Sequence, residues 1–597
     1  MFQTFDTPSS PDAGPGRLAR LRAALTSHNL SGFLVPRADA HQGEYVAPCD
    51  ERLSWLTGFT GSAGFAAILP TIAGVFVDGR YRIQVKTQVA DVFTPVDWPE
   101  TKLGPWLLDH AASGDVIGYD PWLHTKGEID ALTDALADSG ITLATTPNLV
   151  DQIWDDRPPR PLGKLMAQPI EFSGKTSGDK RRDIGALLAK ADQDVAVLTL
   201  PDSIAWLLNI RGSDIARNPV PLCFALIHKD GLVDLFIEPE KTAHLGPDPA
   251  ITQHAPETFT SVLRQLSGTV RVDPKTAPIA VSQILDEAGI SVAYSDDPCI
   301  LPKAIKNDAE LQGTREAHLR DGAGMVEFLA WLDDEAPKGT LTEIDVVTKL
   351  EAFRSATNML REISFDTICG AGPNGAIVHY RVTEDTNRKV SPGELLLVDS
   401  GGQYPDGTTD ITRTIAIGTP RADQRSCFTR VLQGMIAISR LRWPKGLAGR
   451  DLDALARYPL WLAGQDYDHG TGHGVGVYLC VHEGPQRLSK VSHVPLEPGM
   501  ILSNEPGYYR AGDFGIRIEN LIAVKTAPAL PGADDRQMLA FETLTFAPID
   551  RALIDTSMMS VAEIDWLNQY HRDVFEKLEG RVSTSARAWL EQATATF

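Results

Sequence analysis

The feature that most constrains this chain is a repeated segment in which an acidic residue ends an apolar strand. The segments SPGELLLVDSGGQY (391–404) and EPGMILSNEPGYY (497–509) share one layout. Each begins with a Pro-Gly turn and continues as a short apolar run. A carboxylate stands seven residues after each proline, Asp399 in the first segment and Glu505 in the second. Acids are uncommon inside strands, so a matched pair indicates a shared purpose.

A second strand is predicted after each segment, and each of these carries a second acid. The acids are Asp410 in GTTDITRTIAIG and Glu519 in GIRIENLIAV. Two such hairpin-like units facing each other would bring four carboxylates to one point. Buried carboxylates lose their hydration and raise one another's pKa unless cations lie between them. Two divalent ions would balance four carboxylates, which predicts a two-metal site; for any single acid, a solvated strand end or a salt bridge is the alternative.

The Gly-rich segment HGTGHGVG is the candidate source of a nitrogen ligand. His469 and His473 lie four residues apart, but the glycines around them disfavour the helix of an HExxH zinc protease. The segment is no nucleotide loop either, because Val475 replaces the third glycine of G-x-G-x-x-G. Glycine lets a backbone pass close to a crowded site. A lone histidine is more often structural, but His482 follows nine residues after His473.

One imidazole with four carboxylates is a hard, oxygen-rich ligand set. It favours Mn²⁺, with Co²⁺, Fe²⁺ or Zn²⁺ able to substitute. Two such ions would share a bridging hydroxide, lower its pKa and polarise a carbonyl group. The set therefore predicts a two-metal hydrolase.

Another internal repeat links residues 30–85 with residues 190–240. Trp55 and Trp206 each lie six residues before a Gly-Ser pair, and both copies continue as strand, turn and strand. Two related α/β domains in tandem explain this pattern, and chance similarity of short strands is the alternative. RPPRPLG at 157–163 suits a stiff linker between the domains.

Farther along the chain, helical spacing alternates with strands. A long helix is expected over 307–335 after an Asn cap, with further helices in TEIDVVTKLEAFRSAT, RSCFTRVLQGMIAISRL and AEIDWLNQYHRDVFEKLEG. This part is predicted to be α+β with a mainly antiparallel sheet.

Length and composition are those of a multidomain globular protein. The 597 residues exceed one core and predict three or four domains. The net charge of -22 argues against a nucleic-acid-binding surface, which needs clustered Lys and Arg. The six cysteines are scattered, the polar start does not resemble a signal peptide, and no apolar run approaches 18 residues. We therefore expect a cytoplasmic protein with reduced thiols and no contact with a membrane.

Six motifs together resemble a known family: VDSGGQY, GTTDITRT, HGTGHGVG, VHEGP, NEPGYY and GIRIEN. They are similar to the creatinase-fold, or pita-bread, metallopeptidases, and within these to the long, three-domain cytosolic aminopeptidase P. WLTGFTGSAG and VDGRY extend the resemblance toward the N-terminus. It implies an α/β and α+β multidomain fold in which two tandem creatinase-type α/β domains precede a pita-bread catalytic domain. The expected divisions are 1–155, 156–310, 311–535 and a C-terminal extension at 536–597.

The resemblance also implies an activity and a ligand set. The expected enzyme releases an N-terminal residue from peptides with proline in second position, with two divalent ions, most naturally Mn²⁺, in each subunit of a homodimer. Asp399 would bind one metal, Asp410 and Glu519 would bridge both, and His473 and Glu505 would complete the second site. Glu505 would also be the general base.

Roles toward the substrate follow from the same resemblance. His379 in IVHYRVT and His482 in VHEGP would contact the substrate and stabilise its developing oxyanion. Arg517 would join them among the catalytic residues. The residues expected to line the proline pocket, relay protons or contact the peptide are His469, Tyr509, Arg517 and Arg80.

Three other readings remain open from the sequence. Prolidase would use the same metals on dipeptides only, but its chain is usually shorter and lacks a second N-terminal domain. Methionine aminopeptidase lacks the large N-terminal region. A non-catalytic pita-bread protein that binds peptides normally loses the metal ligands, and all five matching residues are present here.

Overall fold

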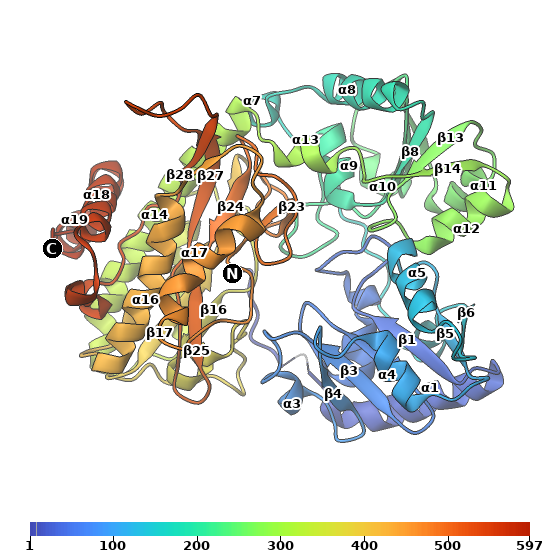
Figure 1. Ribbon diagram of the computed structural model, residues 1–597, viewed down its shortest axis with the longest axis horizontal. Coiled ribbons are helices and arrows are strands. Elements are labelled where there is room, and N and C mark those ends of the chain that lie inside the picture. Colours follow the sequence, from blue (N-terminus) through green and yellow to red (C-terminus); the bar gives the residue numbers. More distant parts are fainter. Residues whose placement is uncertain (8) are drawn as a thin grey trace. The chain divides into compact units, whose positions relative to one another are not determined.

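The computed structural model describes residues 1–7 and 9–597. The chain divides into two compact units, and each is described by itself. The N-terminal unit consists of Pro8–Ile170 and Lys175–Ile300, and the C-terminal unit consists of Met1–Thr7, Glu171–Gly174 and Leu301–Phe597. Figure 1 shows the elements of both units.

The N-terminal unit contains two sheets with the same topology. The first has the strand order β4-β3-β2-β1-β5-β6 and the second has the order β12-β11-β10-β8-β13-β14. In both, the first and second strands along the chain pair antiparallel, and the first and fifth pair parallel. The strands of the first sheet are β1 (Gly32–Pro36), β2 (Phe65–Ile68), β3 (Ala73–Val77), β4 (Thr94–Asp97), β5 (Val116–Tyr119) and β6 (Thr142–Thr145). Those of the second are β8 (Val195–Leu198), β10 (Phe224–His228), β11 (Val233–Phe236), β12 (Ile251–His254), β13 (Thr269–Val272) and β14 (Ser291–Tyr294).

Helices flank both sheets in matching positions. Trp55 lies in α2 (Arg52–Thr57) and Trp206 in α9 (Pro201–Leu208), each helix preceding the second strand of its sheet. The duplication that the two tryptophans predicted is therefore confirmed. The remaining α-helices and strands of this unit are α1 (Gly14–Ser27), α3 (Val85–Gln88), α4 (Leu103–His110), α5 (Lys126–Ala135), α6 (Leu149–Ile153), β7 (Met166–Ala167), α8 (Ser177–Lys190), β9 (Ile210–Arg211), α10 (Pro239–Thr242), α11 (Phe259–Leu263) and α12 (Ile279–Glu287).

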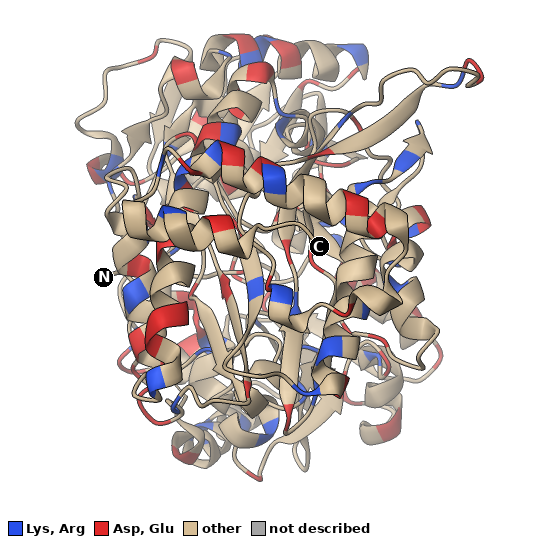
Figure 2. Ribbon diagram, turned by 90° about the vertical axis from the view of Figure 1, so that its left-hand side faces the viewer, with Lys and Arg blue, Asp and Glu red and all other residues tan. Residues whose placement is uncertain are grey.

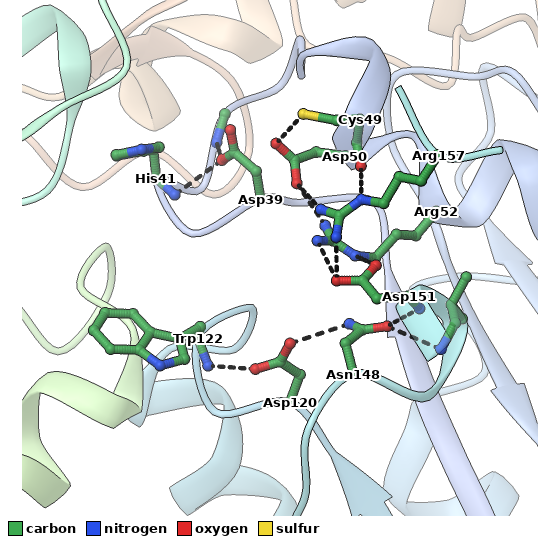
Figure 3. A network of polar contacts seen from close by, with 12 residues as sticks. Asp39, His41, Cys49, Asp50, Arg52, Asp120, Trp122, Asn148, Asp151 and Arg157 are labelled. Atoms are coloured by element: carbon green, nitrogen blue, oxygen red, sulfur yellow. Dashed lines mark hydrogen bonds and ion pairs between the residues drawn. The ribbon is translucent and has the colours of Figure 1, made fainter. Parts of the chain in front are cut away.

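A paired set of charges fastens the first α/β domain. Arg52 donates to Asp151 at 2.6 Å and to Asp50 at 2.8 Å, and Arg157 contacts the same two carboxylates (Figure 3). Two guanidinium groups and two carboxylates leave no net charge, so this half-buried network needs no outside counterion. It joins the start of α2 to α6 and to the beginning of the predicted linker.

The C-terminal unit is built on antiparallel strand pairs covered by long helices. Its strands are β15 (Glu362–Ile363), β16 (Ile368–Ala371), β17 (Leu395–Ser400), β18 (Gly402–Tyr404), β19 (Gly407–Thr408), β20 (Ile411–Ala416), β21 (Arg442–Pro444), β22 (Gly472–Gly474), β23 (Glu483–Leu488), β24 (Ile501–Asn504), β25 (Gly507–Arg510), β26 (Phe514–Arg517), β27 (Asn520–Thr526) and β28 (Met538–Thr543). Its helices are α7 (Ile170–Ser173), α13 (Ile300–Ala304), α14 (Asp308–Glu335), α15 (Glu343–Ser355), α16 (Ala422–Ser439), α17 (Gly449–Trp461), α18 (Val561–Leu578) and α19 (Thr584–Ala593).

The repeated acidic segments form matching strand pairs in this unit. β17 pairs antiparallel with β20, and β24 pairs antiparallel with β27. The strands of each pair are separated in the chain by a smaller antiparallel pair, β18 with β19 and β25 with β26. The predicted hairpin-like unit is thus present twice, with a smaller hairpin inserted in each copy.

The predicted helices are present, and the predicted cap of the longest one is confirmed. The Asn307 side chain accepts hydrogen bonds at the start of α14 and forms a capping box with Glu310. In Figure 1 helix α18 of the C-terminal extension lies beside α14, and it packs against both α14 and α16. A buried apolar cluster that includes Phe428, Tyr570 and Val574 joins these helices to the strands. The C-terminal extension is therefore part of the same core.

Surface and thiol properties agree with the sequence. Figure 2 shows acidic and basic residues mixed along the helices that face the viewer. All six cysteines are free thiols, and five of them are buried. Among the described residues, no helix combines the length and the apolar character needed to cross a membrane.

Candidate metal centre

The four predicted acids lie at or beside the ends of the repeated strands, and the predicted histidine lies in a neighbouring strand. Asp399 is in β17, opposite Thr412 of β20. The other acids flank strand ends: Asp410 directly precedes β20, Glu505 directly follows β24 and Glu519 directly precedes β27. The fifth residue, His473, is in β22, the neighbour of β24.

Ligand atoms from both strand pairs converge. Atoms of Asp410, His473 and Glu519 lie within 4.8 Å of one another. His473 Nε2 is 3.5 Å from Asp410 Oδ2 and 3.3 Å from Glu505 Oε1, so it touches one acid of each pair. His473 Nδ1 lies 2.9 Å from the carbonyl oxygen of Gly474, which can only accept, so Nδ1 carries the hydrogen. In the neutral tautomer with its hydrogen on Nδ1, the lone pair is on Nε2, the ring nitrogen that lies nearest the carboxylates.

The carboxylates are buried and close enough to repel one another. Burial raises the pKa of Asp410 well above its usual value, and the charges of Asp399 and Glu505 raise it further. Burial and the neighbouring acids likewise raise the pKa of Glu519. Asp399 Oδ1, Asp410 Oδ1 and Glu519 Oε1 are buried oxygens without a hydrogen-bond partner among the described residues. Oxygens in this state fit divalent cations, because cations relieve both desolvation and repulsion.

Three of the four acids have a different support. Arg517 donates to Asp399 Oδ2 at 2.6 Å, Thr412 donates to Glu519 Oε2 at 2.8 Å and Ser503 donates to Glu505 Oε1 at 2.9 Å. Such partners orient ligands and set their basicity. Sequence reasoning missed Thr412 and Ser503. The available signal was spacing, because each stands two residues from an acid and strand residues two apart share a face.

The residues predicted for the proline pocket form one chain of hydrogen bonds. His469 Nδ1 lies 2.7 Å from the carbonyl oxygen of Gly470, so its Nε2 accepts from Tyr509 OH at 2.9 Å. Tyr509 OH in turn accepts from Arg517 at 2.6 Å. Burial raises the pKa of Tyr509 to about 12, which keeps the phenol protonated. Arg517 thereby joins the chain to Asp399.

The structure places the two oxyanion candidates differently. The ring of His482 packs edge-on against that of His473, with centroids 4.3 Å apart. Its neighbour Glu483 is buried and held by Lys303 and Lys306. His379 lies in the irregular segment after β16, where the carbonyl oxygen of Val378 accepts a hydrogen bond from Arg517 at 3.3 Å.

Arg80 is the one predicted site residue in the N-terminal unit. Its guanidinium donates to Asp78 at 2.7 Å and lies 5.3 Å from the ring centre of Tyr81. Its contact with a peptide stays a prediction.

Comparison with known proteins decides the family. A protein of Aspergillus fumigatus named "Probable Xaa-Pro aminopeptidase P" is 40% identical over 97% of this chain and 92% of its own length. One from Paracoccidioides brasiliensis with the same name is 40% identical over 97% of this chain and 98% of its own. Residues 312–526 match metallopeptidase family M24. The chain belongs to the aminopeptidase P group of this family.

The family also accounts for the other regions. Residues 17–153 and 156–310 each match a creatinase/prolidase N-terminal domain, and residues 537–597 match the C-terminal region of peptidase M24. The crystal structure of X-prolyl aminopeptidase from Caenorhabditis elegans, described as a cytosolic enzyme with a di-nuclear active site, superposes with a TM-score of 0.92. It is 34% identical and covers 98% of this chain and all of its own. The predicted fold class is confirmed.

Two buried hydrogen-bond networks beside the predicted metal site were not predicted from the sequence. In the first, Arg457 of α17 donates to the carbonyl oxygen of His469 at 2.6 Å and to Asp453 at 2.8 Å. Asp453 also accepts from Thr471 at 2.6 Å, so this ion pair holds the Gly-rich segment in place. Its only sequence signal is the i,i+4 spacing of Asp453 and Arg457 on a helix.

The second network surrounds Arg413, which is fully buried without a carboxylate partner in the described structure. Its guanidinium donates to the carbonyl oxygens of Glu519 at 2.6 Å and Thr412 at 2.9 Å, and to the hydroxyl oxygen of Tyr570 at 2.9 Å. Burial lowers the pKa of Arg413. Tyr570 comes from α18, so the C-terminal extension supports the backbone of a predicted metal ligand.

Proposed function

We propose that this protein is a metal-dependent aminopeptidase that hydrolyses the bond between an N-terminal residue and a following proline. The observation that carries the proposal is the convergence of Asp410, His473 and Glu519 within 4.8 Å, beside the hydrogen-bond chain from His469 to Arg517. The three ligand residues suit metals that support hydrolysis, and the hydrogen-bond chain supplies polar groups beside them. The membership of this protein in the aminopeptidase P group supports the same reaction.

The proposed cofactor is a pair of divalent ions, with Mn²⁺ as the first choice. Asp399 would hold one ion, Asp410 and Glu519 would bridge both, and His473 and Glu505 would complete the second set. When bound, the ions supply an activated water and polarise the scissile carbonyl group. A donor set made mostly of oxygen atoms favours Mn²⁺ and is not the donor set of a zinc-selective site.

Glu505 is the proposed general base. Its side chain is 16% exposed, against 4% for Asp410, so it is the more accessible of the two to water. A serine hydroxyl supports it, whereas a guanidinium neutralises Asp399. Glu505 would take a proton from the attacking water and pass it to the leaving nitrogen. The proline nitrogen bears no hydrogen in the peptide bond and leaves as a secondary amine, so it must receive one proton on departure.

Substrate orientation is assigned to the histidines and the tyrosine–arginine pair. His379 and His482 would donate to the carbonyl oxygen as its negative charge develops. His469, Tyr509 and Arg517 would line the proline pocket, and Arg80 would contact the peptide. The protonated Tyr509 can donate to one partner while Arg517 stabilises its oxygen.

The remaining features of the proposal concern organisation. We propose domain limits at 1–155, 156–310, 311–535 and 536–597, and a cytoplasmic location, which the free thiols suit.

A homodimer is supported by an exposed apolar stripe on and just after α17, formed by Leu455, Tyr458, Trp461 and Leu462. Leu462 is 73% exposed, so Leu462→Glu should shift the protein to a monomer in light scattering, whereas a wild-type protein that is already monomeric would contradict the dimer.

Prolidase is the alternative activity. A dipeptidase structure from Mycobacterium ulcerans shares the fold, at a TM-score of 0.50, but covers 62% of this chain. The deciding experiment reconstitutes the protein with Mn²⁺ and offers Ala-Pro, Ala-Pro-Ala and Ala-Ala-Ala. Release of alanine from Ala-Pro-Ala but not from Ala-Ala-Ala is expected. Cleavage of Ala-Pro alone would establish prolidase activity, and cleavage of no peptide would remove the enzyme proposal.

A further inference from the structure

The first seven residues form an extended strap within the C-terminal unit. Although they start the chain, they belong to the same compact unit as the metal centre. Gln3 is 2% exposed, far less than its neighbours Phe2 and Thr4. A polar residue so deeply buried in an extended segment needs specific partners, and Gln3 has them.

Gln3 contacts the backbone on both sides of Thr367. The amide nitrogen of Thr367 donates to Gln3 Oε1 at 2.8 Å, and Gln3 Nε2 donates to the Thr367 carbonyl oxygen at 3.4 Å. The backbone nitrogens of Phe2 and Gln3 donate to Glu351 at 2.6 and 3.3 Å. Thr367 directly precedes β16, whose residue Ile368 is paired with Asp399. The strap therefore fastens the strand next to a predicted metal ligand.

The second half of the strap binds the segment that follows His379. Arg381 donates to the carbonyl oxygen of Thr4 at 3.0 Å. The backbone nitrogen of Glu384 donates to the carbonyl oxygen of Phe5 at 2.8 Å. Two hydrogen bonds to the strap backbone therefore hold the chain just beyond His379.

Apolar packing and an ion pair reinforce this attachment. Phe5 packs against the buried cluster that contains Tyr380 and Val382, the residues on either side of Arg381. Arg381 also pairs with Asp366 at 3.0 Å, beside the threonine that Gln3 contacts. The strap thus contacts the chain both before β16 and after His379.

On its other side, the same segment is tied to the metal centre. The carbonyl oxygen of Val378 accepts from Arg517, which also donates to Asp399. Tyr380 is anchored by its hydroxyl group, which donates to the buried Glu343 at 2.9 Å. His379 therefore lies between a residue tied to the metal centre and residues tied to the strap.

We propose that the strap, anchored by Gln3, positions His379 for catalysis. This inference rests on the proposed function, in which His379 contacts the scissile carbonyl group. Gln3 is a positioning residue, because it acts through Thr367 and the 379–385 segment and touches no reacting atom. Small displacements of a catalytic group can cost about 10²-fold in rate, so loose attachment here would be felt in turnover.

The test compares three variants of the full chain: Gln3→Leu, removal of residues 2–7, and Asp6→Ala as the matched control. Asp6 is exposed in the same strap. For the first two variants we expect faster amide hydrogen exchange over residues 366–386 and a roughly ten- to hundredfold lower kcat, with KM and metal content unchanged. The control should match wild type in each measurement.

A double-mutant cycle with His379→Ala makes the test specific. If the strap acts through His379, Gln3→Leu should cost little further kcat once His379 is absent. Equal losses in both backgrounds, unchanged hydrogen exchange, or a loss of kcat that follows a loss of metal would each overturn the proposal. Failure of wild-type protein to cleave Ala-Pro-Ala would instead remove the proposed function, while the exchange measurement would still report whether the strap holds the segment.

Discussion

The two strand pairs that meet at the metal centre have the same topology but support their acids differently. In the β17/β20 pair, Asp399 is fixed by a guanidinium group. In the β24/β27 pair, the equivalent Glu505 is supported by the Ser503 hydroxyl and keeps a partly exposed side chain. The guanidinium group holds Asp399 in a fixed position as a metal ligand, whereas Glu505 has a neutral partner and a side chain that water can reach. The two equivalent positions therefore give their acids different surroundings, which suits the different roles that we propose for them.

His473 connects the two pairs, and its loss should have the largest effect. It touches Asp410 of one pair and Glu505 of the other, so His473→Ala should weaken metal binding and lower kcat/KM by roughly 10³-fold or more. Elemental analysis and steady-state kinetics measure both effects. The exposed His493→Ala is the control and should behave as wild type. Full metal occupancy in His473→Ala would show that the pairs do not depend on this imidazole.

Replacing each of the two equivalent acids by its amide tests the difference between the strand pairs directly. Glu505→Gln keeps an amide oxygen but removes the base, so kcat should fall by about 10³-fold at saturating metal. Asp399→Asn removes a charge and leaves Arg517 without its carboxylate, so its first effect should be a lower metal affinity. Metal titrations followed by turnover at full loading separate the two. If both variants lose only affinity, the assigned difference in roles is wrong.

Substitution of His482, whose ring packs against that of His473, tests whether this histidine acts on the metal or on the substrate. His482→Ala should leave metal content nearly unchanged and lower turnover by roughly 10²–10³-fold, the usual worth of one oxyanion donor. The measurement is kcat on Ala-Pro-Ala at full metal occupancy. Wild-type turnover would mean that His482 only packs beside the Gly-rich segment.

The hydroxyl supports should give the smallest effects. Thr412→Val and Ser503→Ala each remove a hydrogen bond to a predicted ligand, and metal affinity should fall about 10- to 100-fold. Thr414→Val is a matched control, because its hydroxyl donates to the backbone of Arg517 and not to an acid. A control that loses as much metal affinity as Thr412→Val would trace the effect to the strand and not to the ligand.

Much of this architecture was predictable because the signals are local or repeated. The Asn307 cap and the apolar spacing after it predicted α14, and the Trp55 and Trp206 repeats predicted two sheets of one topology. The paired acids predicted strand pairs that meet at one place. Each of these signals depends on residues close in the chain or on a motif that occurs twice. Both kinds of signal can be recognised in the sequence without knowledge of the tertiary structure.

The supporting contacts could not be predicted in the same way. Tyr570 reaches Arg413 from 157 residues away, and Thr367 meets Gln3 across 364 residues. No periodicity in either segment indicates its partner. Arg413 would have been expected to find a carboxylate, yet its contacts in the described structure are carbonyl, amide and hydroxyl oxygens.

The sequence by itself determined the family, the two repeats and the acids and histidine proposed as ligands, because residue type and spacing carry that information. Tertiary structure alone decided which atoms support each acid, and that the strap belongs to the unit holding the metal centre. The physical reason is that a buried polar group must find a partner wherever packing brings one within hydrogen-bond distance. That distance is set by the packing of helices and strands and not by position along the chain.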